Sequence, residues 1–255
     1  MSSGAFTLWQ RELVRFFRQR SRVIGAIGSP AIFWLLLGSG FGQSFRPATA
    51  GPLVNGYLEY FYPGTLALIV LFTSIFSTIS IIEDRHEGFL QGVLVAPVSR
   101  IDIVTGKLLG AATLATLQAT IFLLAAPVAV RTLTPEIVLH TIGVLAVLSI
   151  ALSGLGFIVA WQFDSVQGFH AIMNMVLVPL WILSGAAFPA GGAAPWVATL
   201  MTANPLTYGV AALRHVLSDK PLVGEPSLSL SLLVISLFGI ITMCLSVVLV
   251  RRDTR

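Results

Sequence analysis

The chain has 255 residues, of which 56% are hydrophobic and only 10% charged, and its mean hydropathy is +0.90. A soluble domain carries about 25% charged residues, so the composition excludes an ordinary soluble protein and indicates an integral membrane protein. The formal net charge is +4. The single cysteine, Cys244, excludes an internal disulfide and any metal or redox site built from several cysteines.

Charge-free stretches mark where the chain can cross a membrane. A membrane helix needs about 20 apolar residues, and six uncharged runs reach that length: 23–45, 60–82, 108–130, 137–163, 165–213 and 226–250. The fifth run exceeds one span, so we assign its crossing to residues 170–188, because glycine and proline break residues 189–208. We therefore predict an all-α integral membrane protein with six transmembrane helices in a single domain, residues 1–255.

The placement of basic residues predicts the orientation. With a cytoplasmic N-terminus, the segments 1–22, 83–107 and 251–255 carry 11 basic residues on the inner side, against 4 on the outer side. Loops rich in Lys and Arg stay in the cytoplasm. Both termini are therefore predicted to be cytoplasmic. Because topology accounts for the basic residues, we expect no nucleic-acid partner.

Residues 1–22 predict an amphipathic helix lying in the membrane interface. At 100° per residue, one face is basic and the opposite face apolar; the two sets are Arg11, Arg15, Arg18 and Arg22, and Phe6, Trp9, Leu13, Phe16 and Phe17. In such a helix the rings lie among acyl chains and the guanidinium groups near lipid phosphates. The helix either only anchors the first span or forms a cytoplasmic elbow that contacts a partner.

The segment 83–107 predicts two helices separated by a break. Apolar residues recur at helical spacing from Phe89 to Leu94, and Pro97 ends that helix because its ring cannot continue the backbone ladder. Ser99 can then cap a second helix beginning at Arg100. The predicted arrangement lies across the cytoplasmic face, where another protein could push it, although a plain interfacial hairpin fits the same composition.

The acidic residues of this segment also allow a different chemistry. Glu83, Asp84 and Glu87 could mimic the metal-binding carboxylates of a membrane enzyme acting on lipid. Arg85 lies among them and no second acidic set accompanies them, so a solvated helix end is the favoured interpretation. We therefore expect no catalytic and no metal site.

Other motifs for chemistry do not occur in the sequence. The four histidines lack metal-ligand spacing, and Gly106-Lys107 is followed by Leu108 where a phosphate-binding loop needs Ser or Thr. No Asp, Glu, Lys or Arg lies inside the predicted hydrocarbon regions, which disfavours an ion-coupled carrier. Gly106 and Gly110 offer a small-residue packing face, which does not by itself establish self-association.

The stretch after the fifth span predicts an unusual outer segment. Prolines and glycines interrupt the apolar run, and non-helical backbone at membrane depth needs burial in protein or a cavity. We expect residues 189–213 to form short re-entrant helices, with a surface loop as the alternative. His170 and Asn174 share a helix face, and with Ser184 and Tyr208 they are candidates for a pathway wall. For His170 and Asn174 an ordinary interhelical hydrogen bond is the favoured interpretation.

Short motifs along nearly the whole chain resemble one family. Those of the loop are Glu87-Gly88, Leu94, Pro97-Val98-Ser99-Arg100 and Gly106-Lys107; later ones are Gln167-Gly168-Phe169, Met173-Asn174, Pro179-Leu180, Leu183-Ser184-Gly185, Phe188-Pro189, Asn204-Pro205-Leu206-Thr207-Tyr208 and Leu213-Arg214. Their order and spacing are similar to those of type-2 ATP-binding-cassette (ABC) permeases, the membrane subunits of exporters. The sequence departs from the pattern at Phe89 and Gln91, where the family often has Thr and Glu.

The resemblance implies a function and its partners. Segment 83–100 would contain the coupling helix that docks on an ATPase, with Glu87, Gly88, Leu94, Pro97 and Arg100 as its functional residues. The permease would work in the bacterial inner membrane as a dimer with a second copy or homologue and two ATPase subunits. The ATPase subunits would bind ATP and Mg, and this chain would hold no cofactor. The cargo would be drug-like, lipid or polysaccharide, and the rival interpretation remains the lipid-modifying enzyme.

Overall fold

A computed structural model describes residues 3–18, 20–42, 56–130, 133–218 and 224–252. All regular structure in these ranges is helical. The elements are α1 (Ser3–Arg18), α2 (Arg20–Phe41), α3 (Tyr57–Ser77), α4 (Ile79–His86), α5 (Phe89–Val95), α6 (Arg100–Phe122), η2 (Leu123–Ala125), α7 (Ala126–Ala129), α8 (Pro135–Trp161), α9 (Val166–Trp181), η3 (Ile182–Ala186), η4 (Ala190–Gly192), α10 (Pro195–Ala203), α11 (Pro205–Leu217) and α12 (Leu228–Arg252).

Five helical stretches in the described residues are long and apolar enough to cross a membrane. They are Tyr57–His86, Arg100–Ala129, Pro135–Trp161, Val166–Ala186 and Leu228–Arg252. The first predicted span corresponds to α2, whose apolar part, Ile27–Phe41, is shorter. Length and composition therefore support five of the six predicted spans, and the sixth stays a prediction. Its predicted run, 23–45, extends beyond the described residues.

Helix α3 forms the centre of the bundle. Phe61, Tyr62 and Leu66 are fully buried, and the same holds for most of the helix down to Ile75. Helices α2, α6, α8, α9 and α11 surround it, and α12 packs on the outside against α8 and α11. A helix surrounded by protein on all sides must be apolar all round, which explains the uninterrupted hydrophobic run of this span.

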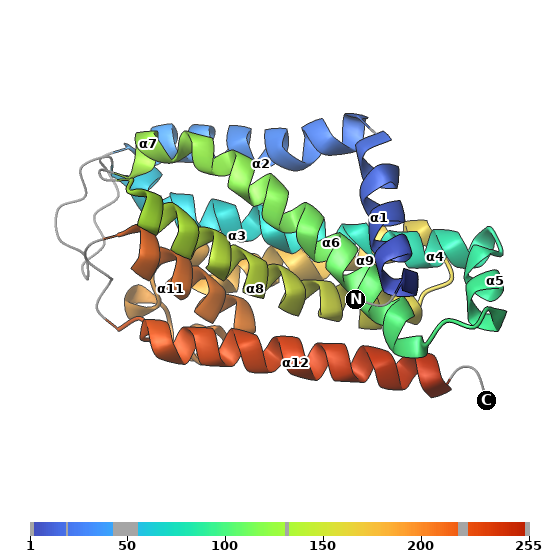
Figure 1. The fold of residues 1–255 in the computed structure, drawn as a ribbon. Coiled ribbons are helices and arrows are strands. Elements are labelled where there is room, and N and C mark those ends of the chain that lie inside the picture. The colour runs from blue at the N-terminus through green and yellow to red at the C-terminus, as the bar shows by residue number, and fades with distance from the viewer. Residues whose placement is uncertain (1–2, 19, 43–55, 131–132, 219–223, 253–255) are drawn as a thin grey trace.

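The end of the bundle that is predicted to be cytoplasmic, called the inner end below, carries α1, α4 and α5. Figure 1 shows α1 lying across the ends of the long helices, beside α4 and α5, with both chain ends at this same end of the bundle. The predicted break is confirmed: α5 ends at Val95, and the Ser99 hydroxyl accepts a hydrogen bond from the Asp102 amide at 3.0 Å, which caps α6. The turn between α4 and α5 needs Gly88, whose φ of 74° is left-handed.

The outer segment contains the interrupted helices that its glycines and prolines predict. Helix α9 continues into a π-type turn in which Gly185 adopts a φ of 81°, a conformation that favours glycine. Helix α11 then packs against α3, α8 and α12, whereas α10 lies on the rim with Trp196 exposed. One of the two short helices is thus embedded in the bundle, and their depth in the membrane stays a prediction.

Candidate functional site

A network of charged side chains joins α1, α4 and α6 at the inner end. At its centre Asp84 is fully buried, and Arg11 donates to its two oxygens at 2.9 and 2.7 Å. Arg15 donates to the same carboxylate at 2.9 Å, and Lys107 of α6 donates to it as well. Lys107 also donates to Glu12 at 2.6 Å and to the Ser80 hydroxyl at 3.2 Å. Every buried charge of this network therefore has an opposite charge beside it.

Buried charged side chains need partners of opposite charge. An isolated charge in the interior costs several kcal/mol, and opposite charges with good hydrogen bonds offset that cost. Arg11 and Arg15 lie one turn apart and reach α4 from the same face of α1. Burial alone lowers the pKa of Arg11, but the hydrogen bond and negative charge of Asp84 outweigh it and raise the pKa, so this guanidinium stays charged.

Two glycines let α1 approach α6 closely. A Cβ at Gly106 would lie 2.8 Å from the Ala5 carbonyl oxygen, and one at Gly110 would lie 2.7 Å from the Glu12 Cβ. The small-residue face offered by the sequence is therefore occupied by α1 of the same chain. Trp9 adds a hydrogen bond at 3.1 Å from its indole nitrogen to the Thr113 hydroxyl.

These contacts correct two predictions. Lipid phosphates are not the partners of Arg11 and Arg15, because the carboxylates of α4 bind both side chains. Arg18 is exposed and has no ion-pair partner among the described residues, whereas the side chain of Arg22 lies outside them. The solvated helix end predicted for residues 83–87 is wrong at Asp84, which is buried among three cations.

The predicted coupling residues occupy different environments. Glu87 is 59% exposed and lies 3.5 Å from Arg15, and Gly88 and Pro97 are exposed beside it. Leu94 packs against the core instead. Arg100 donates to the Leu94 carbonyl at 2.9 Å, so it holds the end of α5.

Helix α5 also presents an apolar side chain that sequence analysis missed. Val95 is 87% exposed, more than any other large hydrophobic residue of the described chain. It is the last residue of α5, at the end of the bundle where Figure 1 places this helix. An exposed valine between two anchored helix ends is available for contact with another protein. The apolar spacing at 89–94 gave no signal for it, because Val95 lies off that face.

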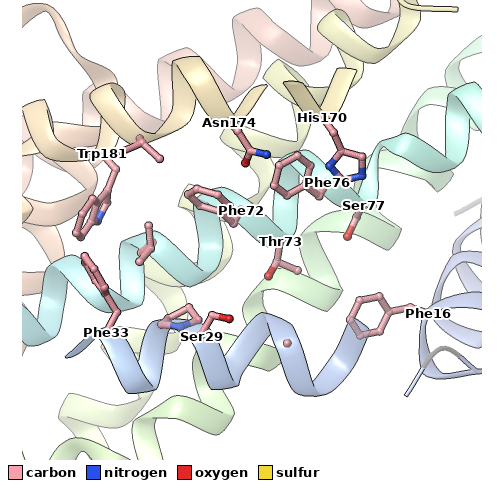
Figure 2. Close-up of a pocket in the computed structure, with 14 residues that line it drawn as sticks. Phe16, Ser29, Phe33, Phe72, Thr73, Phe76, Ser77, His170, Asn174 and Trp181 are labelled. Atoms are coloured by element: carbon pink, nitrogen blue, oxygen red, sulfur yellow. The ribbon is translucent and has the colours of Figure 1, made fainter. Parts of the chain in front are cut away.

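A cavity of about 540 Å³ lies between α2 and α9, with α3 as its floor. Figure 2 shows its wall, which is mainly aromatic and aliphatic with a few uncharged polar groups. The lining residues are Phe16, Gly25, Ser29, Pro30, Phe33, Leu68, Phe72, Thr73, Phe76, Ser77, His170, Asn174, Val178 and Trp181. None of these residues is acidic, Lys or Arg.

Aromatic residues close the outer end of this cavity. The Trp181 ring centroid lies 6.0 Å from that of Phe33 and 5.6 Å from that of Phe61. Its indole nitrogen donates to the Gly64 carbonyl at 2.8 Å, which fixes the ring. At the inner end Figure 2 places Ser77 and His170 together with Phe16 and Phe76. The cavity therefore combines aromatic rings at both ends with polar groups at its inner end and middle.

The structure assigns the predicted pathway residues to two regions. His170 and Asn174 line the cavity, and neither side chain forms a hydrogen bond with another described residue, so the favoured interhelical hydrogen bond stays a prediction. Ser184 and Tyr208 lie elsewhere. The Ser184 hydroxyl donates to the Trp181 carbonyl at 2.6 Å, and the Tyr208 hydroxyl to the Thr202 carbonyl at 3.0 Å.

A second buried ion pair fastens the outer segment, and its arginine entered the sequence predictions only through topology and the motif Leu213-Arg214. Arg214 is 5% exposed and donates to Glu225 and, at 3.2 Å, to the Gly185 carbonyl. The Tyr60 hydroxyl donates to the same carbonyl at 2.8 Å, and the Arg214 guanidinium lies 4.6 Å from the Tyr60 ring centroid. The left-handed turn at Gly185 is thus held from two sides.

Comparison with known proteins identifies the family. Residues 4–218 match the family of the ABC-2 type transporter. A putative transport permease, ycf38, of Cyanophora paradoxa is 28% identical over 227 residues, which cover 88% of this chain and 77% of the relative. Nodulation protein J of Rhizobium meliloti (strain 1021) is 26% identical, covering 96% and 92%. The daunorubicin resistance ABC transporter permease protein DrrB1 of Streptomyces coeruleorubidus is 23% identical, covering 82% and 73%. With its apolar helices and this match over most of its length, the chain belongs to the ABC-2 type transporter permease family.

Proposed function

We propose that this chain is the membrane-spanning permease subunit of an ABC exporter, driven by ATP that separate subunits hydrolyse. Two ATPase subunits, which hold the ATP and Mg, serve a pair of permeases formed with a second copy or a homologue. The complex works in the bacterial inner membrane with both termini in the cytoplasm. Names of relatives support the transport role, since they are described as transport and drug-resistance permeases.

The observation that carries the proposal is the inner end of the bundle. Helix α5 presents Val95 and the Glu87 turn to the exterior, while Arg100 fixes its far end. A docking element must be both accessible and rigidly attached, because a force applied to a loose loop would not reach the spans. Segment 83–100 fulfils both requirements.

Two connections lead from this segment into the membrane. The first is covalent, because α4 continues α3 with only Thr78 between the two helices. The second is the ion-pair network, in which Asp84 binds Arg11, Arg15 and Lys107. A displacement of α5 therefore moves α3, α1 and α6 together. These are the helices that enclose the cavity on its inner side or pack directly behind it.

The cavity defines the kind of cargo that fits this account. Its wall contains no acidic residue, Lys or Arg, and combines aromatic rings with hydroxyl, amide and imidazole groups. Aromatic and aliphatic linings with a few polar groups bind apolar ligands and orient them. The expected cargo is an uncharged, amphipathic molecule with an apolar body and one hydrogen-bonding end, such as a drug-like molecule or lipid.

The rival interpretation as a lipid-modifying enzyme loses its chemical basis. It requires Glu83, Asp84 and Glu87 to bind a metal ion together. In the structure Arg11, Arg15 and Lys107 neutralise Asp84, and Arg15 also pairs with Glu83 at 2.8 Å. Cations already occupy the positions that a metal ion would need.

Gentle extraction of the tagged chain tests the proposal. We expect a nucleotide-binding subunit to co-purify and to hydrolyse ATP. Reversal of the accessible charge, Glu87→Arg, should uncouple ATP hydrolysis from transport or release that subunit. The matched control is Glu136→Arg, an exposed glutamate at the N-terminus of α8, at the other end of the bundle. A chain that purifies alone, or equal loss in both variants, would contradict the proposal.

A further inference from the structure

We propose that Phe16 of α1 is the inner gate of the aromatic cavity, and that the ion-pair network holds this gate closed. The inference rests on the proposed function in one respect only: the gate would serve transport. The cavity is open along its side, where Phe33, Asn174 and Val178 are exposed, so the proposal concerns its inner end alone and is tested without ATP or a partner.

The position of Phe16 distinguishes it from its neighbour. Phe16 is 5% exposed and lines the cavity, whereas Phe17 is 50% exposed and is not among the lining residues. Figure 2 places Phe16 at one end of the cavity, near Ser77, and places Phe33 and Trp181 at the other end. It is the one lining residue that α1 contributes among those described. An element outside the spans therefore supplies the inner closure.

The network fixes the helix that carries this ring. Arg15 precedes Phe16 directly, and both Arg15 and Arg11 bind Asp84 of α4. Glu12 lies one turn before Phe16 and binds Lys107 of α6. The ring is thus positioned by ion pairs to both helices that flank α5. Movement of α5 and α4 relative to the spans would shift α1 and withdraw Phe16 from the cavity.

The chemistry of the two ends explains why the inner end is the one that opens. At the outer end, Trp181 packs on Phe33 and Phe61 and donates a hydrogen bond to the Gly64 carbonyl. At the inner end Phe16 has ring contact with Phe17 alone among the described aromatic residues. A single ring on a separate helix is displaced more easily than three rings on packed spans. Cargo would therefore enter past Phe16 from the inner side.

Thiol labelling of a residue in the cavity tests the gate. The native cysteine is replaced, Cys244→Ala, and Ser77→Cys places a thiol in the cavity wall. Inverted membrane vesicles are treated with a membrane-impermeant sulfonated maleimide on the face that carries α1. Phe16→Ala should raise the labelling rate on the order of tenfold, because a large packed side chain is deleted. Val14→Ala, a truncation at a 46% exposed position of the same helix, should leave the rate unchanged.

Further variants separate gating from misfolding. Phe16→Leu should label slowly, since a large apolar side chain still fills the space. If Phe16→Ala does not reach the membrane, Phe16→Val replaces it and should raise the labelling rate by less. Equal rates for the Phe16→Ala and Val14→Ala variants, or fast labelling of the parent, would overturn the gate. Failure to find an ATPase partner would overturn the proposed function and leave this result unaffected.

Discussion

Removing the charge of Asp84 is the perturbation that tests the inner network most sharply. Asp84→Asn keeps the shape of the side chain but leaves three cations around a neutral group that is fully buried. Breaking a buried ion pair from one side costs about 3–5 kcal/mol. The matched control is Asp164→Asn, whose carboxylate is 90% exposed and pairs with Arg85 at 3.1 Å. Such a surface pair is worth about 0–1 kcal/mol.

The assay is thermal unfolding of the two purified variants in the same detergent. For a chain of this size each kcal/mol shifts Tm by about 2–4 °C. Asp84→Asn should therefore lower Tm by about 6–20 °C, and Asp164→Asn by about 4 °C or less. Loss of the network should also change the fluorescence of Trp9, which lies on α1 against α6. Equal Tm values for the two variants would refute the claim that Asp84 fastens α1 to the bundle.

Three further substitutions test the packing and the outer segment. Gly106→Ala should destabilise the chain by about 1–3 kcal/mol because its Cβ meets α1. Gly143→Ala, in open space on α8, should leave stability unchanged. Unfolding in denaturant compares the two variants, and equal effects would refute the close approach of α1 and α6. Gly185→Ala should cost about 1 kcal/mol for its left-handed φ, and Gly192→Ala, with normal φ, much less by the same assay. Glu225→Gln leaves a buried arginine unpaired and should increase proteolysis of the outer segment; unchanged cleavage would contradict the fastening.

Local rules account for the parts of the structure that the sequence predicted well. The spans follow from length and apolarity, because a helix in lipid must satisfy its own backbone groups. Ser99 followed by Asp102 marks the start of α6 through a cap that depends on neighbouring residues only. Pro97 and Gly88 mark the break and the turn of segment 83–107 for the same reason.

The charge network could not be read from the chain because its members come from three distant segments. Glu12 and Lys107 are 95 residues apart, and nothing in their neighbourhoods specifies the partner. One weak signal existed: Glu12 is the only acidic residue before Glu59, in a helix otherwise rich in arginine. A carboxylate there, together with the small-residue face at Gly106, suggests a helix that packs on protein rather than on lipid.

The cavity and the outer ion pair could not be predicted from the sequence for the same reason. Sequence analysis selected His170 and Asn174 from their spacing, which is a property of one helix. The spacing along one helix could not place Phe16 beside them, since Phe16 belongs to α1, which reaches the cavity by lying across the ends of the spans. Arg214 was counted as a marker of topology, and its burial depends on how α11 packs against α3.

Site-specific photo-crosslinking from position 95 tests the central claim most directly. A photoreactive residue replaces Val95 on α5, and a control chain carries it at Val128, which is 55% exposed on α7 at the opposite end. Both chains are irradiated in native membranes and their adducts are identified by mass spectrometry. The account predicts one dominant adduct from position 95, with an ATP-hydrolysing subunit, and none of it from position 128. Lack of an adduct from position 95, or the same products from both positions, would contradict the claim that α5 receives the ATPase.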